Sequence, residues 1–365
     1  MKHHISSASR WRFGLVGVGR GSAYGRLLAD NSNCEVVACC DASHEALAHF
    51  QQELGMPDSA CYTDYDQFIS SLPMDAVFLG TPIPAHADET VKAVEAGVNV
   101  LSEVTAASTV EDCGRIVEAV RRTGKTYMLA ENCCYWHFVL EWKELVQSGR
   151  LGTVVYSECE YLHPLPEMIV DPETGEYQWR AQRPPLHYCS HSLGPILEIT
   201  RDRITRAMGM GQGHKVAPEH RVVGAIDIQV GLFETKRGAL IKLLRTSIAP
   251  RRPHMHYYML QGTRGYIETD RRGPKTGQVY LADEMEQAQE FELHLSDPNL
   301  PPEAHAGGHG TSEYLVVQEF LRALETGERP PLDEVRAMDL TVPGIIAHES
   351  VMQGGVWLNV PSFSE

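Results

Sequence analysis

Residues whose side chains could move a proton lie close together near the middle of the chain. Tyr188 and His191 stand three residues apart, and His187 directly precedes the tyrosine. Histidine titrates near neutral pH, so His191 could accept a proton from a hydroxyl group. A tyrosine can act as an acid or a base where neighbouring cations lower its pKa. The same spacing also fits a structural interpretation, in which Tyr188 caps a core and His191 is a buried, hydrogen-bonded histidine.

A glycine-rich stretch near the N-terminus could hold a phosphate-containing ligand. Gly17, Gly19 and Gly21 follow a short apolar run and precede a helix-like segment. Glycine lets the backbone approach a pyrophosphate closely, and the free N–H groups that begin a helix favour negative charge. The G-x-G-x-x-G pattern is imperfect, because Ser22 stands where the third glycine is expected. We count Arg20, between the glycines, among the candidate cofactor-binding residues.

The segment after this stretch indicates which dinucleotide it would bind. Residues 35–41 form an apolar run that ends in Asp41, about 20 residues beyond Gly19, where the dinucleotide fingerprint places a ribose-binding carboxylate. The charge of Asp41 would repel a 2′-phosphate, which favours NAD over NADP. The alternative is an ordinary strand of a parallel sheet followed by a surface acid.

The elements that would position these residues alternate between strand and helix. Strands are expected at 13–18, 35–41, 76–79, 99–102 and 126–130, and helices at 43–54, 85–96 and 110–123. This alternation predicts an α/β Rossmann domain with a parallel, doubly wound sheet over residues 11–135, after a flexible segment at 1–10. Ligands bind at the carboxyl ends of such strands, so Thr81, Pro82, Glu103, Glu131 and Asn132 are expected to line a cofactor cleft.

From residue 151 the pattern changes to strands that follow one another with short turns. Strands are expected at 154–161, 222–235, 239–248, 257–261, 265–269 and 278–282, with helices from 190, at 313–326 and at 332–354. Residues 136–365 are therefore predicted to form an α+β domain with an open, mainly antiparallel sheet. The C-terminal helices are expected to pack back against the first domain.

Length and composition exclude several classes of protein. A chain of 365 residues can form about two domains. Its net charge of −16 argues against nucleic acid or an anionic membrane surface as a partner. It has no apolar run long enough for a membrane span and no signal-peptide pattern, so we expect a cytoplasmic location. The nine cysteines fit buried, reduced thiols better than disulfides.

Several segments resemble one known superfamily. The two-domain pattern, together with Thr81-Pro82 and His86 four residues later, resembles the Gfo/Idh/MocA oxidoreductases over nearly the whole chain. The sequences Glu-Asn-Cys-Cys-Tyr at 131–135 and Tyr-x-x-His-x-Leu-Gly-Pro at 188–195 are similar to the NAD-dependent glycoside hydrolase branch, the α-N-acetylgalactosaminidase group. Trp179-Arg180 and Gly308-His-Gly310 are similar to that branch as well. The resemblance adds His86 to the candidate cofactor-binding residues.

Two departures from the dehydrogenases of this superfamily affect the expected chemistry. Their Glu-Lys-Pro motif is replaced by Glu103-Val104-Thr105, so the lysine that assists proton transfer is absent. His187 stands where their aspartate would precede the histidine. The resemblance then implies that Tyr188, His191 and His187 are the catalytic residues. The candidate substrate-binding residues are Tyr161, His163, Trp179, Arg180 and His309.

The resemblance implies an enzyme that uses NAD and acts on a small-molecule sugar or glycoside. Its expected mechanism is oxidation of the C3 hydroxyl, loss of the C2 proton, elimination of the anomeric group, hydration and re-reduction, which together amount to hydrolysis. A plain NAD-dependent sugar dehydrogenase is the alternative, and a non-catalytic NAD-binding sensor is a third. Superfamily members tend to pair through the exposed sheet, so we expect a homo-oligomer formed by the C-terminal sheet.

Two other ligands were weighed from the residue pattern. His163, His187, His191 and His309, with Glu158 and Glu160 nearby, could bind a metal, but no third ligand stands at a diagnostic spacing, so no metal site is assigned. A basic cluster could instead bind an anionic substrate, although such clusters are more often solvated loops that pair with acids. Its members are Arg245, Arg251, Arg252, His254 and His256.

Overall fold

The chain forms two compact units, each built around its own β-sheet. The structure is a computed structural model, and it describes residues 10–71, 73–253, 255–272 and 275–364. The expected flexible segment 1–10 lies outside the described residues except for Arg10, and so does His254. The first unit contains residues 1–103, 114–130 and 298–334, and the second contains 104–113, 131–297 and 335–365.

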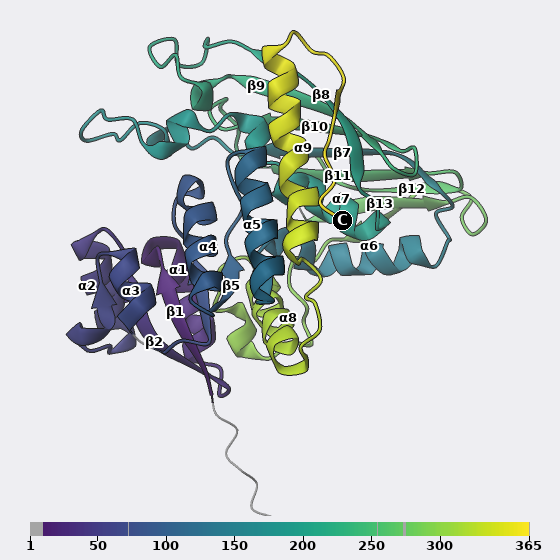
Figure 1. The fold of residues 1–365 in the computed structure, drawn as a ribbon. Coiled ribbons are helices and arrows are strands. Elements are labelled where there is room, and N and C mark those ends of the chain that lie inside the picture. The colour runs from purple at the N-terminus through teal and green to yellow at the C-terminus, as the bar shows by residue number, and fades with distance from the viewer. Residues whose placement is uncertain (1–9, 72, 254, 273–274, 365) are drawn as a thin grey trace, which may run out of the picture. The chain divides into compact units, whose positions relative to one another are not determined.

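The sheet of the first unit has six strands in the order β3-β2-β1-β4-β5-β6, and every pair in it is parallel. The strands are β1 (Trp11–Val16), β2 (Cys34–Cys40), β3 (Cys61–Tyr62), β4 (Ala76–Leu79), β5 (Asn99–Ser102) and β6 (Tyr127–Leu129). Helices α1 (Val18–Ala29), α2 (His44–Leu54), α3 (Tyr65–Ser71) and α4 (His86–Glu95) accompany them (Figure 1). The expected Rossmann-type α/β fold is confirmed.

The turn between β1 and α1 is shorter than the sequence predicted. Strand β1 ends at Val16 and α1 already begins at Val18, so Gly19 and Gly21 lie in the first turn of the helix. Gly17 alone makes the turn, with φ of 75°, and a Cβ there would lie 2.5 Å from the backbone of Gly80. The expectation that all three glycines precede the helix was therefore wrong, because one left-handed glycine is enough to connect strand and helix.

Helix α8 (Ser312–Thr326) also belongs to the first unit, far from the other elements in sequence. It contacts α1, and Phe320 meets Phe13 of β1 edge to face at 6.1 Å between ring centroids. Tyr24 of α1 stacks on Phe78 of β4 at 4.3 Å. Helix α5 (Val110–Thr123) has residues in both units.

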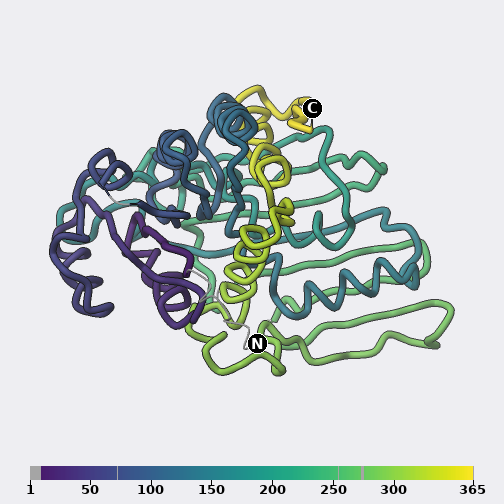
Figure 2. The backbone as a smooth tube through the Cα atoms, turned by 60° about the horizontal axis from the view of Figure 1, so that its bottom comes forward, coloured from purple at the N-terminus to yellow at the C-terminus, as the bar shows by residue number. Residues whose placement is uncertain are grey.

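The sheet of the second unit has nine strands in the order β14-β13-β12-β11-β7-β10-β9-β8-β15 (Figure 2, teal and green). These are β7 (Val154–Leu162), β8 (Ile204–Gln212), β9 (Ile228–Thr235), β10 (Leu240–Thr246), β11 (Met255–Gly262), β12 (Gly265–Thr269), β13 (Thr276–Leu281), β14 (Gln289–Glu292) and β15 (Leu358–Asn359). All of its pairs are antiparallel except β7 with β10, which is parallel. The predicted mainly antiparallel sheet is confirmed.

Helices of the second unit pack against this sheet. Helix α7 (Ser190–Thr200) contacts β7, β11 and α6 (His137–Gln147). Helix α9 (Glu334–Met352) crosses β8 so closely that a Cβ on Gly209 would lie 2.1 Å from the carbonyl oxygen of Ala347. Sequence reasoning missed β8 because its glycines lower strand propensity, yet the helix crossing requires one of them.

Candidate functional site

A row of polar side chains crosses the middle of the second sheet. In the strand register Arg245 of β10 is the partner of Tyr161 of β7 on one side and of Gln229 of β9 on the other. His256 of β11 is the other neighbour of Tyr161. Residues paired in register point to the same face of a sheet, so these four side chains share one face. Neighbouring positions on this face of β7 and β10, such as Cys159 and Leu243, are fully buried.

The residues of this row contact one another directly. The rings of Tyr161 and His256 stack at 4.0 Å between centroids, and the guanidinium of Arg245 lies 4.3 Å from the Tyr161 ring centre. The Tyr161 hydroxyl is 2.7 Å from Nδ1 of His163, and burial raises the pKa of Tyr161 to about 12. Tyr161 and His163, which were both predicted to bind substrate, are therefore hydrogen-bonded to each other.

The start of α7 brings Tyr188 and His191 onto this row. Tyr188 ends a short 3₁₀ turn (Pro185–His187) and His191 is the second residue of α7. The Tyr188 hydroxyl lies 3.2 Å from Nε2 of His191, and the rings meet edge to face at 4.9 Å. The two predicted catalytic side chains thus form a hydrogen-bonded pair beside Tyr161, whose ring lies 5.8 Å from that of His191.

Glu131 holds the other nitrogen of the histidine, and this partner was not among the predicted catalytic residues. Its Oε1 lies 2.6 Å from Nδ1 of His191, and the side chain is fully buried. Burial raises the pKa of Glu131, but the charge and hydrogen bond of His191 outweigh that effect, so the pKa is lowered. An ionised Glu131 requires the proton of the imidazole on Nδ1, which leaves Nε2 to accept the Tyr188 hydroxyl. The position of Glu131 just after the 126–130 strand was the available signal in the sequence.

His187 has a different environment from the other two predicted catalytic residues. Its ring lies edge to face with His348 of α9 at 5.3 Å. Burial, together with nearby His348 and Arg183, lowers the pKa of His187 to about 3. His187 is therefore neutral at physiological pH and a much weaker base than an ordinary histidine.

Trp179 and Arg180 lie in a 3₁₀ turn (Trp179–Gln182), and a second cation, Arg183, directly follows this turn. The Arg180 guanidinium stacks on Trp179 at 4.4 Å. Arg183 lies 4.4 Å from the ring centre of Tyr188 and 5.5 Å from that of Trp179. This turn thus joins the predicted substrate-binding pair to the Tyr188–His191 pair through Arg183, which the sequence analysis did not single out.

Within the described residues, one cluster has metal-ligand geometry. Ligand atoms of Glu131, Cys133 and His191 lie within 4.8 Å of one another. The short contact of Glu131 with the histidine is the kind of carboxylate–histidine hydrogen bond that orients an imidazole. The histidines and acids that were weighed as metal ligands from the sequence, apart from His191, do not belong to this cluster.

The glycine turn of the first unit borders a cavity of about 450 Å³. It is lined by Val16, Gly17, Gly19, Arg20, Cys40, Asp41, Ala42, Thr63, Tyr65, Gly80, Thr81, Pro82, Ala85 and Glu89. A Cβ on Gly19 would meet no atom within 4 Å, so the backbone there faces open space. Six of the predicted cofactor-binding residues therefore surround one cavity.

Asp41 already accepts two hydrogen bonds from the backbone beside this cavity. Its carboxylate bonds the amides of Val18 and Ser43, each at 2.9 Å. A carboxylate has about four acceptor positions, so Asp41 can still receive hydroxyl groups. The same residue therefore also fixes the turn and the start of the next helical segment.

Glu89 is an acid of the cavity wall that the sequence analysis did not single out. It accepts a 2.5 Å hydrogen bond from the Thr81 hydroxyl. Burial raises its pKa to about 7, although that hydrogen bond acts in the opposite direction. Its protonation state therefore changes near neutral pH.

The remaining predicted cofactor-binding residues have varied positions. His86 is fully buried and bonds the Thr81 carbonyl at 2.8 Å, so it can position that turn. The Ser22 hydroxyl donates to the Gly19 carbonyl, and a Cβ added at Gly21 would lie 3.7 Å from the side chains of Leu15 and Phe78. Asn132 is buried in the second unit.

Glu313 connects predicted binding residues of the first unit. Arg20 and Glu103 were predicted to bind the cofactor, and His309 was predicted to bind the substrate. The Arg20 guanidinium pairs with Glu103 at 2.6 Å and with Glu313 at 3.2 Å. Glu313 also accepts a bond from Nδ1 of His309 at 2.5 Å. Burial raises the pKa of Glu313, but His309 and Arg20 outweigh it, and the pKa is lowered. Helix α8 thus links His309 to the glycine turn, a connection that spacing in the sequence does not reveal.

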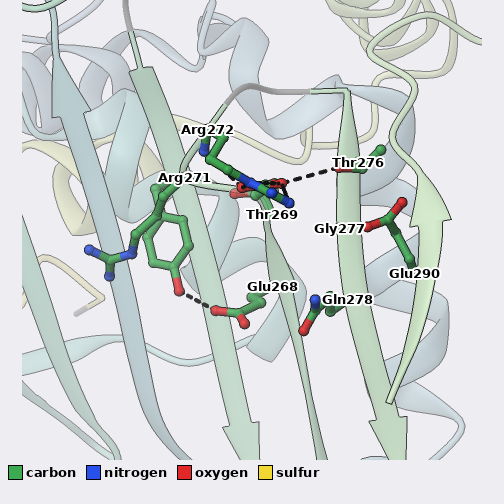
Figure 3. Close-up of a pocket in the computed structure, with 10 residues that line it drawn as sticks. Glu268, Thr269, Arg271, Arg272, Thr276, Gly277, Gln278 and Glu290 are labelled. Atoms are coloured by element: carbon green, nitrogen blue, oxygen red, sulfur yellow. Dashed lines mark hydrogen bonds and ion pairs between the residues drawn. The ribbon is translucent and has the colours of Figure 1, made fainter.

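A second pocket, of about 280 Å³, lies among β11, β12, β13 and β14 (Figure 3). Tyr257 donates to Glu268 there, and exposed Arg272 pairs with Asp270. Arg271 bridges Glu158 and Glu160 and lies over Tyr257. These charges are paired with each other, and no residue predicted to be functional lines this pocket.

Comparisons with known proteins agree with this architecture. Residues 11–131 match the model of an oxidoreductase family with an NAD-binding Rossmann fold, and residues 201–365 match the C-terminal domain of glycosyl hydrolase 109. A glycosyl hydrolase family 109 protein of Shewanella pealeana is 27% identical over 389 residues, which cover 97% of this chain and 85% of the relative.

Solved structures with the same fold include two dehydrogenases. An inositol dehydrogenase homolog from Azotobacter vinelandii, complexed with NADH and myo-inositol, has a TM-score of 0.77 at 20% identity and covers 96% of this chain and 98% of its own. A levoglucosan dehydrogenase complexed with NADH and L-sorbose has a TM-score of 0.82 at 17% identity, with 97% and 100% covered.

None of the helices in the described part of the chain has the length and hydropathy needed to cross a bilayer. The matches to the two halves of the chain, with relatives that extend over nearly all of it, confirm the resemblance. This chain joins an N-terminal part that matches the NAD-binding Rossmann fold of the Gfo/Idh/MocA oxidoreductase model to a C-terminal part that matches the C-terminal domain of glycosyl hydrolase 109.

Proposed function

We propose that this protein is an NAD-dependent glycoside hydrolase that ends each turnover with its cofactor in the starting oxidation state. The observation that carries the proposal is the hydrogen-bonded chain Glu131–His191–Tyr188. Such a chain is suited to moving protons on and off a substrate. The family 109 relatives support hydrolysis, and the fold supports a redox cofactor.

The cavity of the first unit fits the NAD expected from the fold. Open space above Gly19 leaves room for a pyrophosphate, and Asp41 can receive the ribose hydroxyls. Gly17, Arg20, Thr81 and Pro82 would hold the rest of the cofactor there. When bound, NAD supplies the site with an acceptor and donor of hydride.

The residues of the second unit would then handle the protons. Nε2 of His191 accepts the Tyr188 hydroxyl, so Tyr188 would pass its own proton to Nε2 while it takes the proton of a sugar hydroxyl as that carbon is oxidised. That proton would then pass to solvent, so that the same Tyr188–His191 pair could take the second proton, which leaves C2 once C3 is a ketone. Glu131 keeps the imidazole oriented and stabilises the imidazolium that forms. Tyr161, His163, Trp179 and Arg180 would bind the sugar around this chain.

A sugar dehydrogenase is the second candidate. The fold neighbours include inositol and levoglucosan dehydrogenases, and the Glu131–His191–Tyr188 chain could serve simple alcohol oxidation equally well. Val104 argues against it, because the lysine that assists proton transfer in those dehydrogenases is absent here.

A panel of aryl glycosides with and without added NAD⁺ tests the proposal. We expect release of the aryl group to need only catalytic amounts of NAD⁺, with no NADH accumulating in proportion to product. Formation of one NADH per sugar oxidised would favour the dehydrogenase.

Pairing of two copies through the nine-stranded sheet stays a prediction, which sedimentation velocity tests.

A further inference from the structure

Two arginines lie buried beside the Tyr188–His191 pair, and neither forms an ion pair with an acid in the described part of the chain. Arg245 is 1% exposed and Arg183 is 9% exposed. One amino group of Arg245 donates to the carbonyls of Tyr161 and Thr246, while Nε of each guanidinium has no hydrogen-bond partner among the described residues. Both guanidinium groups face Tyr188, at 4.4 and 5.7 Å from its ring centre.

The groups that shift the pKa values of these two arginines also indicate that no acidic side chain is paired with them in the described residues. Burial lowers the pKa of Arg183 to about 9, and the nearby charge of Arg245 adds to that effect. Tyr161 and Tyr188 raise the pKa of both arginines, and the main influences on these two pKa values include no carboxylate. Arginine side chains do not lose their proton in proteins, so both guanidinium groups carry a positive charge.

Burying two cations side by side is costly unless an anion compensates them. The chain has 48 acidic residues against 32 lysines and arginines, so acids for pairing are plentiful. The acids on the opposite face of the sheet, Glu158 and Glu160, are instead paired with Arg271. Within the residues that the structure describes, Arg183 and Arg245 therefore present two planar donor groups beside two aromatic rings, Tyr161 and Trp179, with no carboxylate paired to them.

We propose that Arg183 and Arg245 bind an oxyanion on the substrate, so that the preferred sugar carries a carboxylate or sulfate group. The inference rests on the proposed function for the identity of the ligand as a sugar. Guanidinium groups bind such oxyanions through paired hydrogen bonds, and aromatic rings pack against the apolar face of a sugar. The pair thereby selects anionic glycosides over neutral ones.

Titration calorimetry of the NAD⁺-loaded protein tests this selection. The probes are glucuronate and galacturonate against glucose and galactose, with glucose 6-sulfate separating sulfate from carboxylate. We expect an anionic sugar to bind at least about tenfold more tightly than its neutral counterpart, since hydrogen bonds to charged groups are the stronger ones. Arg183→Gln should remove that preference and Arg183→Lys should restore part of it. Exposed Arg264, paired with Asp283, provides the matched control Arg264→Gln, which should leave the preference unchanged.

A second readout does not depend on which sugar is correct. Sodium sulfate, compared with sodium chloride at equal ionic strength, should raise the unfolding midpoint of the unmodified protein more than that of Arg183→Gln. Equal responses, together with no preference for any anionic sugar, would overturn the proposal. So would an equal loss of neutral and anionic binding in Arg183→Gln, because the arginine would then serve Tyr188 itself.

The outcomes separate this inference from the proposed function. If the protein prefers anionic sugars but cleaves no aryl glycoside, the oxyanion site is supported and the hydrolase proposal is contradicted. Cleavage of neutral p-nitrophenyl glycosides, with glucuronides and galacturonides no better, keeps the hydrolase and contradicts the oxyanion site.

Discussion

The two units prepare their candidate sites in different ways. The cavity of the first unit is formed largely by backbone, at one left-handed glycine and at the ends of neighbouring parallel strands. The site of the second unit is formed by buried and half-buried side chains from separate segments that contact one another: Glu131, Tyr161, Arg183, Tyr188, His191, Arg245 and His256. Backbone can hold a common cofactor of fixed shape, whereas side chains can be exchanged to change chemistry and substrate.

The sharpest way to test this difference is to remove the proton-handling side chains. His191→Ala and Tyr188→Phe should each lower kcat by about a hundredfold or more, because general acid–base groups contribute about 10²–10⁴. Steady-state kinetics on a cleaved aryl glycoside measures the loss. NAD⁺ affinity should stay nearly unchanged in both variants.

His187→Ala is the control from the same segment. Its pKa of about 3 makes it a poor base, so the loss of rate should be smaller than for His191→Ala. Near-normal turnover in His191→Ala or Tyr188→Phe would transfer the catalytic role to another residue.

Glu131 is expected to act as a positioning residue, with a smaller effect. Glu131→Gln keeps the shape but removes the charge beside His191, so kcat should fall by about tenfold to a hundredfold. The acidic limb of the pH–kcat profile should move to lower pH, because the imidazolium loses its stabilising anion. An unshifted profile with reduced kcat would indicate that Glu131 has only a structural role. Glu131→Asp should recover part of the rate with the original profile.

In the first unit, Asp41 should control cofactor choice rather than rate. Asp41→Ala should weaken NAD⁺ binding about tenfold or more and narrow its advantage over NADP⁺, since hydrogen bonds to a charged group are worth about 1.5–3 kcal/mol. Asp41→Asn is the matched control, because its amide oxygen can still accept from the Val18 backbone. Equal binding of NAD⁺ and NADP⁺ by the unmodified protein would contradict the assignment.

Glu89 is expected to give the smallest effect, on stability. Its pKa is raised from 4.5 to about 7, so the folded state holds more protons than the unfolded chain between these values. The free energy of unfolding should therefore fall by about 1–3 kcal/mol as the pH rises through this window. Denaturant unfolding from pH 4.5 to 8 should show this contribution, and Glu89→Gln should remove it. An unchanged pH dependence in the variant would mean that Glu89 is already ionised at low pH.

The difference between the backbone-built cavity of the first unit and the side-chain site of the second also explains how far the sequence could predict the structure. The parallel sheet, the cavity at Gly17 and Asp41 and the bounds of β4, β5 and α5 follow from local patterns, and these were predicted. The start of α1 was not, because the conformation of Gly17 decides whether the following glycines lie in a loop or a helix.

The site of the second unit was harder to predict from the sequence, because more of its contacts depend on tertiary structure. Tyr188 and His191 are close in sequence and were singled out, but Glu131 lies 60 residues away. Arg245 and Tyr161 become neighbours only through the parallel pairing of β7 with β10, which the expected antiparallel pattern did not include. His309 reaches Arg20 only through Glu313 of α8, across 293 residues between the arginine and that glutamate.

The fate of the hydrogen at C2 tests the central claim most directly. A cleaved aryl glycoside is processed in heavy water with catalytic NAD⁺, and the released sugar is analysed by NMR and mass spectrometry while NADH absorbance is followed. The proposed hydrolysis removes the C2 proton and returns one from solvent, so the sugar should carry deuterium at C2 without stoichiometric NADH. Unlabelled C2 together with NADH that grows in proportion to product would contradict it and favour the sugar dehydrogenase.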